Sequence, residues 1–274
     1  MSPRRKTKNV PALSRTGVAA AAALSLILAG QLGVLVRFKV GSELVFNCLE
    51  TIPYRESFTD LSADKDGRIY LLYDNRVQVL ERGGAEGPVH PIPAEIRPAA
   101  LEATHDAVFV VGTDIPDLVR IPLAGGQATR VRIPGAQRLA GLASDHDGRL
   151  FAVDQGRCSV FILGEDGAVQ GEFGAPGSGS GEMRNPTHAV WTGDLYVLDP
   201  GNHRIVRWSG KGRFKDAFDA PWEQPTLAHL AADGKGHLFV NNHLAEGVWV
   251  LSEGGKFLGL ATKTKGIDFK IIGP

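Results

Sequence analysis

The sequence is poor in the residues that usually mark a nucleophilic or redox centre. Only two of its 274 residues are cysteines, Cys48 and Cys158, and no Cys-x-x-Cys pair is present. No Gly-x-Ser-x-Gly motif occurs, and no Lys-Ser/Thr follows the Gly-rich run at 174–181. No motif therefore supports serine acyl transfer or phosphate binding. The two cysteines could form a disulfide or remain buried free thiols.

Acidic residues are absent from the first 40 positions, which contain seven Lys and Arg residues. Since the whole chain has 30 basic and 30 acidic residues, the part beyond residue 40 has 23 basic and 30 acidic residues, a net charge of −7. A net acidic domain without a basic stripe binds the nucleic-acid backbone poorly. We therefore predict no nucleic-acid partner.

One long hydrophobic run is present, at residues 17–36, and it contains no charged residue. As a helix it would be about 30 Å long, which is enough to cross the hydrocarbon core of a bilayer. Five basic residues precede the run and two follow it closely. The positive-inside tendency therefore places a basic tail, residues 1–16, in the cytosol. The sequence predicts a single transmembrane helix that holds residues 37–274 on the outer side, periplasmic or extracellular.

A cleaved signal peptide is the alternative interpretation of this run. No convincing small-x-small cleavage site follows it, which favours an uncleaved signal-anchor. Cleavage would instead yield a secreted form. Either interpretation places the rest of the chain beyond the membrane.

The rest of the sequence repeats itself about every 40 residues, the length of a β-propeller blade. In each unit a short apolar strand ends in an Asp/Gly turn, and a second strand ends in Asp or Asn. A third apolar strand and an outer strand follow. Stacking such units in a ring buries both faces of each one, so the pattern predicts an all-β propeller. The most similar parts of the units are residues 61–74, 101–114, 142–154, 190–199 and 230–241.

Residues 172–214, in the fourth unit, closely resemble an NHL repeat. The motif stands here as Asn202-His203, followed by Arg204 and Ile205. The resemblance covers roughly residues 57–258 and implies a propeller of six blades, which we prefer to five. We expect the segments 38–56 and 258–274 to pair and complete a degenerate sixth blade. Residues 37–56 are then a linker and ring-closing strand, and residues 57–274 form the propeller.

The NHL-like turn itself is interpreted as scaffold. Asp199 ends a strand, and Asp74 and Asp154 recur at the same place in other units. Residues that recur in every blade serve the blade, because one ligand site needs its groups only once. We therefore predict no catalytic role for Asp199, Asn202 or His203.

Polar residues that do not recur are better candidates for a site. The inner strand of each blade lines the central channel, so residues at its start share one mouth of that channel. Two imidazoles and one carboxylate meeting there could bind a ligand or form a facial site for a divalent metal. In the alignment of the five units these positions are held by Asp60, Leu101, Gly141, His188 and His229.

The predicted function is a membrane-anchored NHL-type binding module for a protein, peptide or glycan, without catalysis of its own. The alternative is a metal-dependent hydrolase or lyase with Asp60, His188 and His229 at its site. Trp222 lies in the Pro-containing segment 220–225 and is the aromatic residue that we expect to be exposed for ligand contact.

Overall fold

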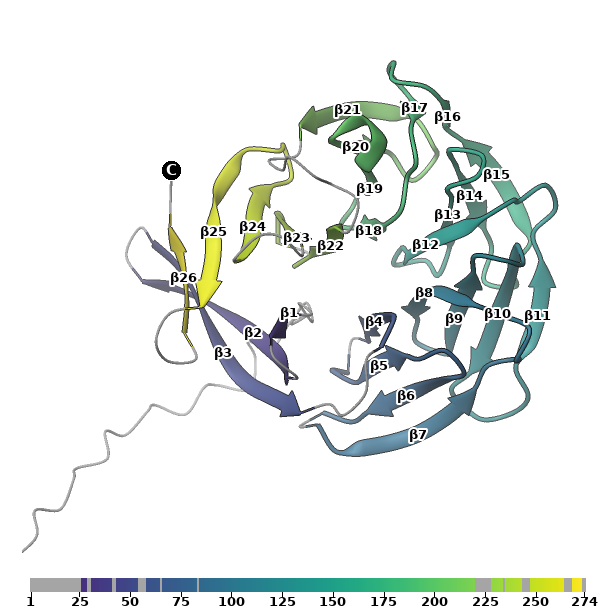
Figure 1. Cartoon of the computed structure of the whole chain (residues 1–274), viewed down its shortest axis with the longest axis horizontal. Coiled ribbons are helices and arrows are strands. Elements are labelled where there is room, and N and C mark those ends of the chain that lie inside the picture. Colours follow the sequence, from purple (N-terminus) through teal and green to yellow (C-terminus); the bar gives the residue numbers. More distant parts are fainter. Residues whose placement is uncertain are drawn as a thin grey trace, which may run out of the picture.

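The computed structural model describes residues 26–28, 31–40, 43–53, 58–64, 66–82, 84–219, 228–233, 235–242, 247–263 and 268–272. The regular elements of this part are β-strands and one 3-10 helix at Pro200–Asn202. Antiparallel blades follow one another around a common centre, with the first strand of each blade innermost (Figure 1). The predicted all-β propeller is confirmed.

Each blade consists of four strands that are consecutive in the sequence and follow one another from the centre of the ring outward. The first blade contains β4 (Asp60–Ala63), β5 (Ile69–Leu72), β6 (Arg76–Leu80) and β7 (Glu86–Pro91). The second contains β8 (Pro98–Ala103), β9 (Ala107–Gly112), β10 (Asp117–Pro122) and β11 (Thr129–Arg132). The third contains β12 (Leu139–Ser144), β13 (Leu150–Asp154), β14 (Ser159–Leu163) and β15 (Val169–Phe173).

The last two blades follow the same plan. The fourth contains β18 (Ala189–Trp191), β19 (Leu195–Asp199), β20 (Arg204–Trp208) and β21 (Phe214–Asp219). It is preceded by a short parallel pair, β16 (Ala175–Pro176) and β17 (Glu182–Met183). The fifth contains β22 (Ala228–Ala232), β23 (His237–Asn242), β24 (Gly247–Ser252) and β25 (Phe257–Lys263).

The second strand of a blade is apolar along most of its length because apolar side chains cover both of its faces. In β5, Tyr70 and Leu72 pack toward the second blade with Val108 and Val110. Comparable clusters join the second blade to the third, the third to the fourth and the fourth to the fifth. On its other face, β5 packs with Phe58 and Leu61. Alternate residues of one strand thus enter different interfaces, as the two-residue period of a strand requires.

The turn after the inner strand is built around an aspartate in three blades. Asp145 Oδ1 accepts hydrogen bonds from the backbone N–H groups of Asp147 (3.0 Å) and Arg149 (2.9 Å). Gly148 follows with a φ of 80°, a conformation that glycine adopts without steric cost. Asp64 and Asp233 make the corresponding bonds in the first and fifth blades. The Asp/Gly pattern in the sequence therefore corresponds to a repeated hairpin turn.

The predicted pairing of the two terminal segments is present, but it does not create a sixth blade. In β3 (Glu43–Pro53), Phe46 lies opposite Phe269 of β26 (Asp268–Ile272). β26 in turn pairs with β25, so these strands continue the sheet of the fifth blade beyond its fourth strand. The structure supports five blades, and the preference for six was wrong. The extension forms because the outer edge of β25 is available for pairing, as the edge of an open sheet is.

Within the described residues, no helix is both long enough and apolar enough to span a membrane. Parts of the run predicted as a helix form β1 (Leu26–Leu28) and β2 (Gln31–Val40), and β2 pairs with β3 as a hairpin. Val34, Val36 and Val40 are β-branched, which suits a strand. The rest of residues 17–36 lies outside the described part.

Candidate functional site

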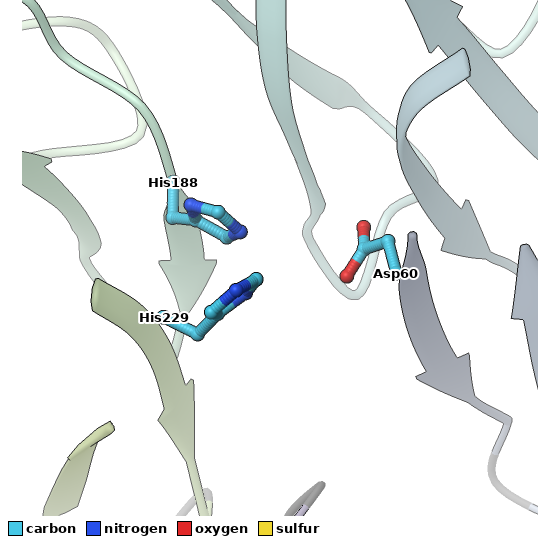
Figure 2. A group of neighbouring side chains, drawn as sticks. All are labelled: Asp60, His188 and His229. Atoms are coloured by element: carbon cyan, nitrogen blue, oxygen red, sulfur yellow. The ribbon is translucent and has the colours of Figure 1, made fainter. Parts of the chain in front are cut away.

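Three side chains that the sequence places at the channel mouth lie together in the structure. Asp60 is the first residue of β4, His229 is the second residue of β22, and His188 immediately precedes β18. One nitrogen or oxygen atom from each lies within 4.8 Å of the others. Figure 2 shows the two imidazoles side by side with the Asp60 carboxylate opposite them. The site therefore combines the first, fourth and fifth blades.

The Asp60 carboxylate is held by the backbone of two blades. It accepts hydrogen bonds from the N–H of Leu61 (2.8 Å) and from the N–H of Leu101 on β8 (2.9 Å). Burial raises the pKa of Asp60 to about 7, and the nearby Glu102 carboxyl adds to the rise, whereas the two N–H donors oppose it. The carboxylate is thus well oriented, but its negative charge is poorly compensated by the surrounding protein.

His188 has an unusual environment for a polar side chain. Its Nδ1 and Nε2 atoms are both buried and have no hydrogen-bond partner among the described residues. Its ring centroid lies 4.4 Å from that of His229, with an angle of 66° between the ring planes. Burial, and then the nearby His229, lower the pKa of His188 to about 3. At neutral pH the imidazole is therefore uncharged and has a nitrogen lone pair available.

Gly141 allows the backbone to approach His188 closely. A Cβ atom at this position of β12 would lie less than 3.0 Å from the carbonyl oxygen of Thr187 and 3.1 Å from the Cα of His188. Any larger residue would push β12 away from the segment that carries the imidazole. Gly141 and Leu101, the apolar members of the aligned set, therefore position the site through their backbones.

The inner strands contain a second polar group, which the repeat pattern did not predict. The carboxyl group of Glu102 on β8 accepts hydrogen bonds from the N–H (3.1 Å) and hydroxyl (2.6 Å) of Ser144 on β12. The Ser62 hydroxyl donates to its other oxygen (3.3 Å). Burial raises the pKa of Glu102 to about 7, although these bonds lower it. The available signal was a charged residue between Leu101 and Ala103, where the other aligned units have uncharged residues.

The side chains of the NHL-like turn have the bonding of a scaffold. Asp199 is fully buried and accepts hydrogen bonds from the Arg184 N–H (2.6 Å), the Asn202 amide (2.7 Å) and the Arg204 guanidinium (2.9 Å). His203 has a φ of 56° and closes the turn. These groups are occupied within the fourth blade, in agreement with their interpretation as structural residues.

Two other sequence features contribute no described contact to the site. Trp222 lies outside the described residues. Cys158 is a free thiol on the third blade and forms no disulfide. The side chain of Cys48 is not among those described.

Comparison with proteins of known structure identifies the fold class of this chain. No family model and no curated protein matches the chain. A streptogramin B lyase structure is similar with a TM-score of 0.60 and 14% identity over 88% of this chain and 74% of that one. A nidogen/laminin complex gives 0.62 and 14%, over 84% and 93%. Virginiamycin B lyase from Staphylococcus aureus gives 0.57 and 12%, over 93% and 98%. The chain is a β-propeller, and at such identities the likeness concerns the fold alone.

Proposed function

We propose that the chain is an NHL-type binding propeller that holds a protein, peptide or glycan over the channel mouth. The observation that carries the proposal is the convergence of Asp60, His188 and His229 from three blades. The hairpin turns and blade cores do not require these groups. Buried polar atoms without partners cost about 1–3 kcal/mol each, so the His188 nitrogens are expected to be used by a ligand. Loops on a rigid ring suit such binding.

The N-terminal charge pattern supports presentation of this propeller at a membrane. Seven basic residues and no acidic residue accompany the uncharged run 17–36. We propose that the N-terminus lies in the cytosol and that the propeller lies on the outer side of the membrane.

Binding can be tested with a glycan array and a displayed peptide library, using the purified full-length protein. The wild type should bind one class of ligand reproducibly. His188→Ala and His229→Ala should each bind that ligand with at least tenfold lower affinity. His105→Ala is the matched control, because this histidine has 64% of its side chain exposed and lies outside the site. Equal binding by all four proteins would show that the channel mouth is not the binding site.

The composition of the site also favours a second candidate, a metal-dependent hydrolase or lyase. One carboxylate and two imidazoles form a donor set that catalytic metal sites use, and a bound ion with open positions acts as a Lewis acid. A panel of ester, amide and glycoside substrates would test this function. Turnover should depend on His188 and disappear with a chelator, and turnover unaffected by both treatments would exclude it.

A further inference from the structure

The ring of blades is held together unevenly. The described inner strands contact one another closely in the order β4, β8, β12, β18 and β22. Apolar clusters shared by adjacent blades follow the same order. Within the described part of the chain, no comparable contact joins β22 back to β4. In Figure 1 the first and fifth blades flank the strands β1–β3 and β26 instead.

No described strand is shared between the first and fifth blades to close this interval. The sheet of the first blade consists of β4–β7 alone, and each described blade is made of consecutive strands. β26 and β3 add to the outer side of the fifth blade through β25, not to the first blade. Among the described residues, the first and fifth blades therefore share no sheet, as is also true of the other neighbouring blades, and they lack the close inner-strand contact that the others have.

The cluster of Asp60, His188 and His229 bridges this interval. Asp60 belongs to the first blade, while His188 and His229 belong to the fourth and fifth. We propose that a divalent transition-metal cation bound by Asp60, His188 and His229 acts as a clasp that closes the ring from within the channel. The inference builds on the proposed use of this site as a ligand-binding centre, and it assigns the ion a structural role.

The donor atoms suit such an ion. Two imidazole nitrogens and one carboxylate oxygen match Zn²⁺ and related transition metals, whereas Mg²⁺ and Ca²⁺ prefer oxygen donors alone. Bonds of about 2.0–2.2 Å would place neighbouring donors roughly 3–3.5 Å apart. The present spread of up to 4.8 Å would then contract by roughly 1–2 Å, within the range of side-chain rotation.

The ion would also supply the interactions that the site needs. A cation compensates the buried Asp60 carboxylate, which the protein supports with two backbone N–H donors and no cation among its described bonds. It also gives one nitrogen of His188 a partner. Asp60 is already fixed by Leu101 of the second blade, and Gly141 sets the approach to His188, so two ligands are positioned by neighbouring backbone before the ion binds.

Metal binding is tested first, on the purified full-length protein. The protein is stripped with a chelator and then loaded with Zn²⁺, Mn²⁺ or Mg²⁺, and the metal retained after desalting is counted by mass spectrometry. We expect about one Zn²⁺ per chain, as for a single site, and no retained Mg²⁺. His188→Ala, His229→Ala and Asp60→Asn should lose the Zn²⁺, and His105→Ala should keep it. A wild type that retains no transition metal would overturn the proposal, whatever the variants do.

The clasp is tested by hydrogen exchange of wild-type protein with and without Zn²⁺. Loading should slow amide exchange in β4 and β22 at least tenfold and should change β9 and β13 much less, since these lie in interfaces that are already closed. Zn²⁺ bound without slower exchange in β4 and β22 would reject the clasp. The array experiment judges the proposed function separately. Ligand binding by a protein that retains no metal would support the proposed binding function and reject the metal clasp. Retained metal without any ligand on the array would support the metal site and reject the proposed binding function.

Discussion

At the scale of single residues, the inner strands place carboxyl groups where little water reaches them. Glu102 is the clearest example, because its hydrogen bonds come from Ser62 and Ser144 on the two neighbouring blades. Its pKa is raised from 4.5 to about 7, mainly by burial. Between these pH values the folded protein holds a proton that the unfolded chain has released. Glu102 therefore makes the protein less stable as the pH rises through this window.

Glu102→Gln should remove this loss of stability, because the amide keeps a hydrogen-bonding shape and does not titrate. Between pH 4.5 and 8 the variant should gain up to about 3 kcal/mol in unfolding free energy relative to the wild type. Urea unfolding of both proteins at pH 4.5, 6 and 8 measures the difference. Parallel pH profiles would contradict a raised pKa at Glu102.

Gly141→Ala should disturb the site without adding or removing a polar group. The new methyl would lie under 3.0 Å from the Thr187 carbonyl oxygen, so β12 must shift. We expect a loss of about 1–3 kcal/mol, typical of an overpacked position. Gly171→Ala on β15 is the control, because its Cβ would meet only Ile162 at 3.7 Å. Chemical unfolding measures the unfolding free energy of both variants. Equal values would show that β12 accommodates the added methyl group without loss of stability.

At the scale of elements, the aspartate turns explain why the repeat is so visible in the sequence. Each such turn needs a carboxylate, a nearby glycine and polar neighbours at fixed spacings, all of which are local requirements. Asp145 additionally accepts a hydrogen bond from the Arg149 guanidinium at 2.7 Å. The same side-chain interaction four residues apart occurs between Asp64 and Arg68 and between Asp233 and His237.

Asp145→Ala should therefore destabilise the third blade by roughly 2–3 kcal/mol, because it removes a buried charged acceptor and leaves two turn N–H groups without their partner. Asp147→Ala, two residues later in the same turn but exposed, should change stability by less than about 0.5 kcal/mol. Urea unfolding provides both values. A similar loss in the two variants would mean that the turn does not depend on Asp145.

Local patterns predicted the blades, and strand periodicity predicted that Asp60, His188 and His229 start their inner strands. Because inner strands of a propeller surround one centre, the predicted propeller also implied that these three side chains lie close together. Glu102 was missed because its partners, Ser62 and Ser144, are about 40 residues away in each direction. The five-bladed ring was misjudged for a similar reason. Whether β26 joins β25 or builds a new blade depends on long-range pairing, which no local pattern encodes.

At the scale of the whole molecule, we expect the uncharged run 17–36 to hold the protein at the membrane, with the basic residues 1–16 and the acidic propeller on opposite sides of it. The full-length protein should remain in the membrane pellet after alkaline carbonate extraction, with an intact N-terminus by mass spectrometry. Leu26→Arg combined with Leu28→Arg should release it, because a charge in an apolar span costs about 2.5–3.5 kcal/mol. A shortened, soluble product of the wild type would instead identify a cleaved signal peptide.

The pairing of β3 with β26 has one more consequence. Residues 45–47 lie opposite residues 268–270, so the two segments that flank the blades are neighbours in space. A circular permutant that links these segments and opens the turn between β14 and β15, where Glu165 and Asp166 are exposed, would keep the described pairs of the other blades. We therefore expect the propeller fold to persist when the order of its blades in the sequence is changed.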